Sequence, residues 1–123
     1  EIDEIHPYPS FILEDGNEFR LDRIYPGNAG KCEKYYADGK VSEGVCGAFY
    51  PEKNITYKVY FDRDKLPYLG FWLTEGGFRG DYNCAMEPAN GFYDSIAASS
   101  RNNAVYCLKA GTSLTFDLEI ELK

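Results

Sequence analysis

Two side chains of this sequence have the chemistry for paired acid–base work: Glu87 and His6. Glu87 follows a short apolar run and precedes Pro88, so we expect it at the end of a strand. A part-buried position would raise its carboxyl pKa above ~4.3 and make it a better proton acceptor near neutral pH. His6 is the only histidine, and an imidazole has an unperturbed pKa of ~6.5. Facing one ligand, the two would suffice for acid–base catalysis, although a lone histidine is more often a hydrogen-bonded structural residue.

The groups that would hold a ligand come from the neighbourhood of residues 76–94. This stretch contains four Gly and one Pro, with charged and aromatic side chains between them. Charged groups on Gly-shaped backbone beside aromatic faces suit a small polar ligand, a sugar above all. We therefore expect four sugar contacts: Trp72, Arg79, Asp81 and Tyr82. The alternative interpretation is a turn-rich β connection preceded by a core tryptophan.

Composition limits the class of partner. The chain of 123 residues carries a net charge of −7, which argues against nucleic-acid and anionic-membrane partners because either would require a basic face. No apolar run approaches the ~20 residues that span a bilayer. The four cysteines form no CxxC pair and only one His accompanies them, so we expect no metal site. We predict free thiols and a cytoplasmic location, and a hairpin that brings Cys32 opposite Cys46 is the alternative.

The elements that must position these residues are strands. Residues 55–61 and 114–122 alternate apolar and polar side chains, the pattern of half-buried strands. Asp15-Gly16-Asn17 predicts a hairpin turn, and residues 29–37 fit either a helix or a hairpin arm. Further strands are expected at residues 68–74, 82–86 and 104–109, and one short helical turn after Asp94-Ser95. The chain is therefore predicted to be all-β, one antiparallel β-sandwich domain over residues 1–123.

Several motifs resemble those of a known family. They are Leu66-Pro67-Tyr68-Leu69-Gly70-Phe71-Trp72, Gly76-Gly77, Met86-Glu87-Pro88-Ala89-Asn90-Gly91 and Asp94-Ser95. Their order and spacing resemble the C-terminal half of aldose 1-epimerase (galactose mutarotase-like) proteins. His6-Pro7 also resembles a His-Pro motif of the bacterial branch. The resemblance implies a portion of a large twisted β-sandwich, the supersandwich of that family. It also implies an isomerase of carbohydrate metabolism that interconverts sugar anomers without a cofactor.

By this resemblance Glu87 removes the anomeric hydroxyl proton while His6 protonates the ring oxygen. The ring opens, the C1–C2 bond rotates, and closure occurs on the other face. The family's Arg and further His from its N-terminal half have no counterpart here, so this chain resembles the C-terminal portion of a longer protein. We expect association with the missing half or with itself, since half a sandwich exposes an apolar face. The alternative function is a non-catalytic carbohydrate-binding or accessory module.

Overall fold

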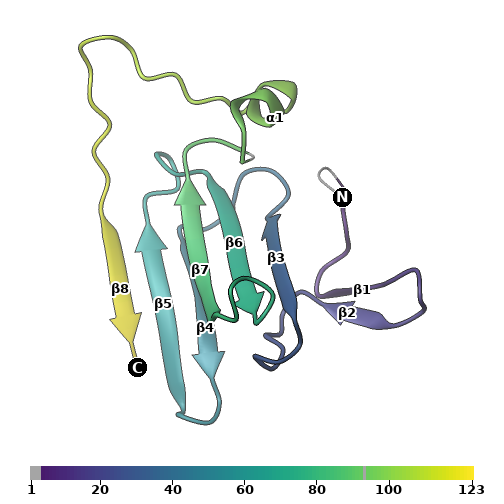
Figure 1. The fold of residues 1–123 in the computed structure, drawn as a ribbon. Coiled ribbons are helices and arrows are strands. Elements are labelled where there is room, and N and C mark those ends of the chain that lie inside the picture. The colour runs from purple at the N-terminus through teal and green to yellow at the C-terminus, as the bar shows by residue number, and fades with distance from the viewer. Residues whose placement is uncertain (1–3, 93) are drawn as a thin grey trace. The chain divides into compact units, whose positions relative to one another are not determined.

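A computed structural model of the chain describes residues 4–92 and 94–123. Two compact units make up the chain: residues 1–33 with 73–83, and residues 34–72 with 84–123. Eight strands and one short helix occur among the described residues (Figure 1). The prediction of an all-β chain with antiparallel sheets is therefore confirmed.

The first unit contains the predicted hairpin, formed by β1 (Ser10–Ile12) and β2 (Glu18–Arg20). Phe11 lies opposite Phe19 in its register. The turn between the strands places Gly16 at φ 84°, a conformation that glycine adopts without steric penalty. The side chain of Asp15 accepts a hydrogen bond from the Asn17 backbone N–H and closes the turn.

One three-stranded sheet has the order β3-β6-β7, from β3 (Lys31–Tyr36), β6 (Tyr68–Glu75) and β7 (Tyr82–Ala89). The prediction of strands at residues 68–74 and 82–86 is confirmed. However, β7 continues past Met86, so Glu87 lies inside the strand and not at its end. The continuation through Pro88 is possible because β7 is an edge strand, where a missing backbone N–H need not break a ladder.

The second sheet lies within the second unit and has the order β4-β5-β8. It consists of β4 (Val45–Tyr50), the predicted strand β5 (Ile55–Phe61) and β8 (Leu118–Leu122). Val59 and Phe61 of β5 are 4% and 7% exposed and belong to the core. Cys84 of β7 is hydrogen-bonded to Tyr50 of β4, so one face of the β3-β6-β7 sheet is directed toward the second sheet.

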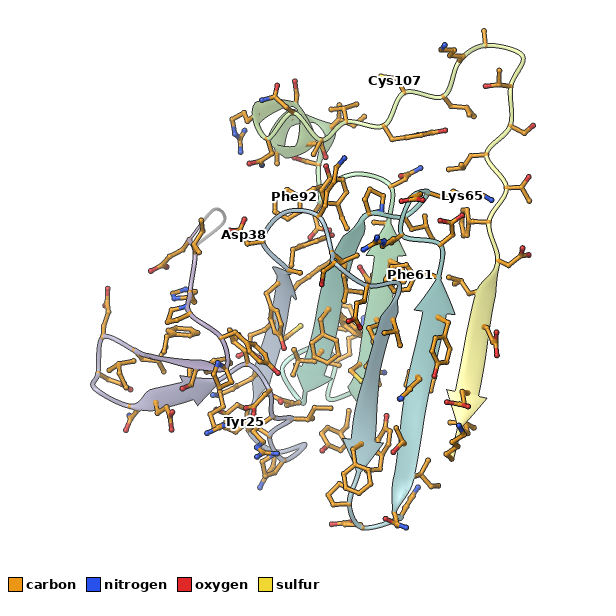
Figure 2. All side chains as sticks on the ribbon, turned by 180° about the vertical axis from the view of Figure 1, so that it is seen from behind. Tyr25, Asp38, Phe61, Lys65, Phe92 and Cys107 are labelled. Atoms are coloured by element: carbon orange, nitrogen blue, oxygen red, sulfur yellow. The ribbon has the colours of Figure 1, made fainter. Side chains whose placement is uncertain are left out.

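Two strand predictions are wrong. Residues 104–109 form no strand, and the final strand begins at Leu118, leaving residues 114–117 in extended chain outside any sheet. Alternating or apolar sequence favours a strand only when a neighbouring strand is present to pair with it. Cys107, within residues 104–109, is exposed, contrary to the buried position that its apolar neighbours suggest (Figure 2).

Residues 29–37 contribute β3, and the cysteine hairpin does not form. β3 pairs with β6, while β4 pairs with β5 and places Cys46 opposite Val59. All four cysteines are free thiols, as predicted. The short helix α1 (Ile96–Arg101) is also where the sequence predicts a helical turn, with Ser95 as its N-cap accepting a hydrogen bond from the Ala98 N–H.

Candidate functional site

Glu87 projects from the face of the β3-β6-β7 sheet that is turned away from β4. Side chains alternate between the two faces of a strand, and Cys84 of β7 points toward Tyr50 of β4. Glu87, three residues further along, therefore lies on the opposite face, which we call the outer face. On β3 the outer-face residues are Lys34 and Tyr36, because Lys34 contacts Glu87 directly.

Four polar side chains meet on this outer face, and we call them the outer-face cluster: Lys34, Tyr36, Glu87 and Asp94. The ammonium Nζ of Lys34 lies 2.6 Å from Oε2 of Glu87 and 2.8 Å from Oδ1 of Asp94. The hydroxyl of Tyr36 donates a hydrogen bond to the same Asp94 oxygen. The Glu87 side chain is 37% exposed. The carboxylate is therefore paired with a cation, yet accessible to a solute.

The cluster depends on a glycine in the central strand. A Cβ atom at Gly70 of β6 would lie 2.9 Å from Cε1 of Tyr36, so the Tyr36 ring occupies the space that any other side chain would fill. The Tyr36 ring also contacts Phe92, at a centroid distance of 5.6 Å and in an edge-to-face arrangement. Phe92 also contacts Tyr68, which is 8% exposed. This aromatic packing fixes Tyr36 beside Asp94.

The charges of the cluster are set by its hydrogen bonds. Burial alone would lower the pKa of Lys34, but its hydrogen bonds to Asp94 and Glu87 outweigh that penalty and raise it. Burial and the hydrogen bond to Asp94 raise the pKa of Tyr36 to about 12. Burial opposes ionisation of Asp94, yet the hydrogen bonds from Lys34 and Tyr36 lower its pKa. At neutral pH Lys34 is therefore an ammonium, Asp94 a carboxylate and Tyr36 a neutral phenol.

Trp72 is the second predicted site residue on this face. It follows Gly70 by two residues on β6, so alternation places its side chain on the outer face as well. It is half-buried. Trp72 and Glu87 therefore share one face of one sheet in the second unit.

The other three predicted sugar contacts belong to the first unit: Arg79 and Asp81 lie in the turn between β6 and β7, and Tyr82 is the first residue of β7. Arg79 is exposed at φ 55°, and its guanidinium lies 5.1 Å from the ring centroid of Phe78. Asp81 is exposed, and its backbone closes the turn by donating to the Phe78 carbonyl. The Tyr82 ring packs on Gly27, where an added Cβ would lie 3.2 Å from it. Their role as sugar contacts stays a prediction.

His6 also belongs to the first unit. Its ring stacks on Phe11, with centroids 3.6 Å apart and planes 16° from parallel, and Nε2 lies 3.5 Å from a carboxylate oxygen of Glu4. Phe11 continues into a row of rings through Phe19 to Tyr25. The packing is that of a structural histidine, the alternative left open by the sequence. Its role as the acid that partners Glu87 stays a prediction.

The sequence alone did not single out Lys34, Tyr36 or Asp94 as site residues. The available signal was the i, i+2 spacing of Lys34 and Tyr36, which puts both on one face if residues 29–37 form a strand. Asp94 directly precedes the Ser95 N-cap, where a helix begins. Within the described ranges, no group of three or more His, Cys, Asp or Glu side chains could hold a metal ion.

Comparison with known proteins gives one match. The family model described as Domain of unknown function (DUF4432) matches residues 32–122. The chain belongs to the DUF4432 family. The matched DUF4432 region includes the whole outer-face cluster and Trp72, and it excludes His6. No curated protein and no solved structure matches the chain significantly. None of the described helices has the length and apolar character needed to cross a membrane.

Proposed function

We propose that this chain is a carbohydrate-binding, aldose 1-epimerase-like protein with Glu87 as its general base. The observation that carries the proposal is the accessible Glu87 carboxylate on the same sheet face as Trp72, with Lys34, Tyr36 and Asp94 around it. An indole face can stack on a pyranose ring, while carboxylate, ammonium and phenol groups exchange hydrogen bonds with its hydroxyls.

In this mechanism Glu87 accepts the proton of the anomeric hydroxyl, and an acid delivers a proton to the ring oxygen. The C1–O5 bond breaks, the open aldehyde rotates about C1–C2, and the reverse proton transfers close the ring on the other face. The neutral phenol of Tyr36 and the ammonium of Lys34 are donors that can hold sugar hydroxyls. We assign the acid to His6 by the resemblance to aldose 1-epimerases. The partners we propose are a small-molecule sugar and the complementary half of an epimerase-like protein, and the free thiols favour the cytoplasm as location.

Polarimetry of fresh α-galactose or α-glucose tests this proposal. The wild-type chain should speed mutarotation above the buffer rate, and Glu87→Gln should remove the acceleration. A wild-type rate equal to that of buffer would end the enzyme proposal for this chain.

A non-catalytic carbohydrate-binding module is the second candidate, and one observation favours it. Oε2 of Glu87 is already engaged by Lys34 at 2.6 Å, so a sugar hydroxyl must displace the ammonium or use the other oxygen. This candidate predicts saturable sugar binding without a rate increase. Because Trp72 is the only tryptophan, its intrinsic fluorescence reports on the outer face alone and would detect such binding.

A further inference from the structure

Among the described residues, no strand pairs with the outer edge of strand β8, so a row of its backbone hydrogen-bonding groups is left open. This strand ends the β4-β5-β8 sheet of the second unit (Figure 1). Lys123 and Thr56 exchange both of their backbone hydrogen bonds. In an antiparallel ladder such pairs alternate, so the backbone groups of Leu118, Ile120 and Leu122 point away from β5. These three residues therefore present their N–H and C=O groups at the open edge.

The same three residues carry an apolar surface that the described chain leaves open. Leu118, Ile120 and Leu122 are 49%, 62% and 68% exposed. Their register partner residues on β5 include Phe61 and Val59, which are buried. The apolar face thus continues from the core outward along β8. A further strand laid against the edge would cover it and complete the ladder.

The opposite face of β8 is acidic, and this determines which strand fits. Asp117, Glu119 and Glu121 alternate with the apolar residues. Lys123 follows on the same face and is paired with Glu121. When two copies of β8 pair antiparallel over their whole length, with Ile120 opposite Ile120, Glu119 of each copy lies opposite Glu121 of the other. Like charges directly opposite one another destabilise a sheet. A second copy of the chain is therefore disfavoured at this edge.

We propose that β8 binds an extended segment of another protein in which apolar residues alternate with Lys or Arg. The apolar side chains of that segment would extend the row of Leu118, Ile120 and Leu122, and its basic side chains would lie opposite the acids. Backbone hydrogen bonds to an exposed edge supply affinity in this mode of recognition, and the alternating side chains supply specificity. The net charge of −7 also favours the approach of a basic partner. The proposal does not depend on the sugar site.

Two labelled, end-capped seven-residue peptides test it by fluorescence anisotropy. One alternates Lys with Val, and the other has Glu in place of each Lys. The Lys peptide should bind saturably and more weakly as salt is raised, and the Glu peptide should not bind. The Glu87→Gln protein should bind the Lys peptide like wild type, which separates this proposal from the proposed function.

Two protein variants locate the contact. Ile120→Pro removes an outward N–H while Glu119 and Glu121 keep their bonds to β5, so it should weaken binding of the Lys peptide at least tenfold. Glu119→Lys preserves the backbone, and it should weaken the Lys peptide and allow the Glu peptide to bind. Circular dichroism checks that each variant is folded. If Ile120→Pro unfolds the chain, the peptide binding of Glu119→Lys alone tests the proposal. Equal binding of both peptides, or binding unchanged in the folded variants, would overturn the proposal. So would a dimer in light scattering that Ile120→Pro disrupts.

Discussion

Two lysines of β3, three residues apart, meet carboxylates in different ways. Nζ of Lys34 lies within 2.8 Å of carboxylate oxygens of both Glu87 and Asp94, in the outer-face cluster of the second unit. In the first unit, Nζ of Lys31 lies over the rings of Phe19 and Tyr25, 4.5 Å and 4.1 Å from their centroids. One ammonium is neutralised by acids, and the other is held by aromatic faces.

Two acids of the first unit, Glu33 and Glu75, have a different environment. Glu75 is 0% exposed; its Oε1 accepts a hydrogen bond from the Tyr25 backbone, while its Oε2 is buried without a hydrogen-bond partner among the described residues. Oε2 of Glu33 is likewise buried and unpartnered there. Burial and the nearby charge of Glu75 raise the pKa of Glu33. Such an arrangement lowers stability at neutral pH. The acids of the outer-face cluster are accessible to a solute, whereas the buried carboxylates of Glu33 and Glu75 lower stability.

The largest effect on stability is expected where the outer-face cluster is most tightly packed. Gly70→Ala puts a Cβ 2.9 Å from the Tyr36 ring, which is too close, so the ring must shift from its packed position. We expect a loss of about 1–3 kcal/mol in the free energy of unfolding, measured by urea denaturation. Gly91→Ala is the matched control, since its nearest contact would be an ordinary 3.4 Å. Equal losses in both variants would show that Tyr36 is not confined by Gly70.

A smaller effect is expected from the central cation. Lys34→Met leaves Glu87 and Asp94 without their ammonium, and it should cost about 0.5–1 kcal/mol at pH 7, because both acids are partly exposed and screened. The lowered pKa of Asp94 means that its stabilisation is present above its ordinary pKa and is lost as the pH falls through the folded value. The difference in melting temperature between variant and wild type should therefore shrink in acid.

The matched control for that variant is Lys123→Met. Lys123 lies 2.6 Å from Glu121, the same distance as in the Lys34–Glu87 pair, but its side chain is 76% exposed. An exposed ion pair contributes little to stability, so the melting temperature of Lys123→Met should equal that of the wild type. A similar loss in both variants would contradict the distinction between the cluster and a surface ion pair.

The smallest effect is expected in the first unit, and it has the opposite sign. Because the pKa of Glu33 is raised, the folded state favours its protonated form. Its stabilisation is complete below the unfolded pKa and is lost as the pH rises through the folded value. Glu33→Gln should therefore raise the melting temperature slightly at pH 7 and have no effect near pH 4. Destabilisation at pH 7 would mean that the Glu33 carboxylate has a stabilising partner.

The sequence predicted elements whose signals are local. The Asp15-Gly16-Asn17 turn, the Ser95 cap and the β5 alternation each depend on a few adjacent residues, and all three are found in the structure. The strand predicted at residues 104–109 is absent, because a segment with strand propensity forms a strand only when a neighbouring strand pairs with it. The cysteine hairpin does not form because β3 pairs with β6, far along the chain, while β4 pairs with the strand that follows it, β5.

The site was predicted only in part for the same reason. Glu87 and Trp72 could be named from sequence, and the structure gives them a common face. The ion pairs of Lys34 with Glu87 and Asp94 could not be predicted from the sequence. They depend on the strand order β3-β6-β7, which brings residues far apart in the chain close together. Long-range pairing determines which charges neutralise one another, and no local pattern encodes it.

We propose that Glu87, and not simply any glutamate of this chain, does the acid–base chemistry. Anomer-exchange rates of galactose, measured by NMR at one protein concentration in Glu87→Gln and in Glu33→Gln, test this role. We expect Glu87→Gln to lower the protein-dependent rate by about 10²–10⁴-fold, while Glu33→Gln leaves it at the wild-type value. Equal rates in the two variants would show that Glu87 is not the base.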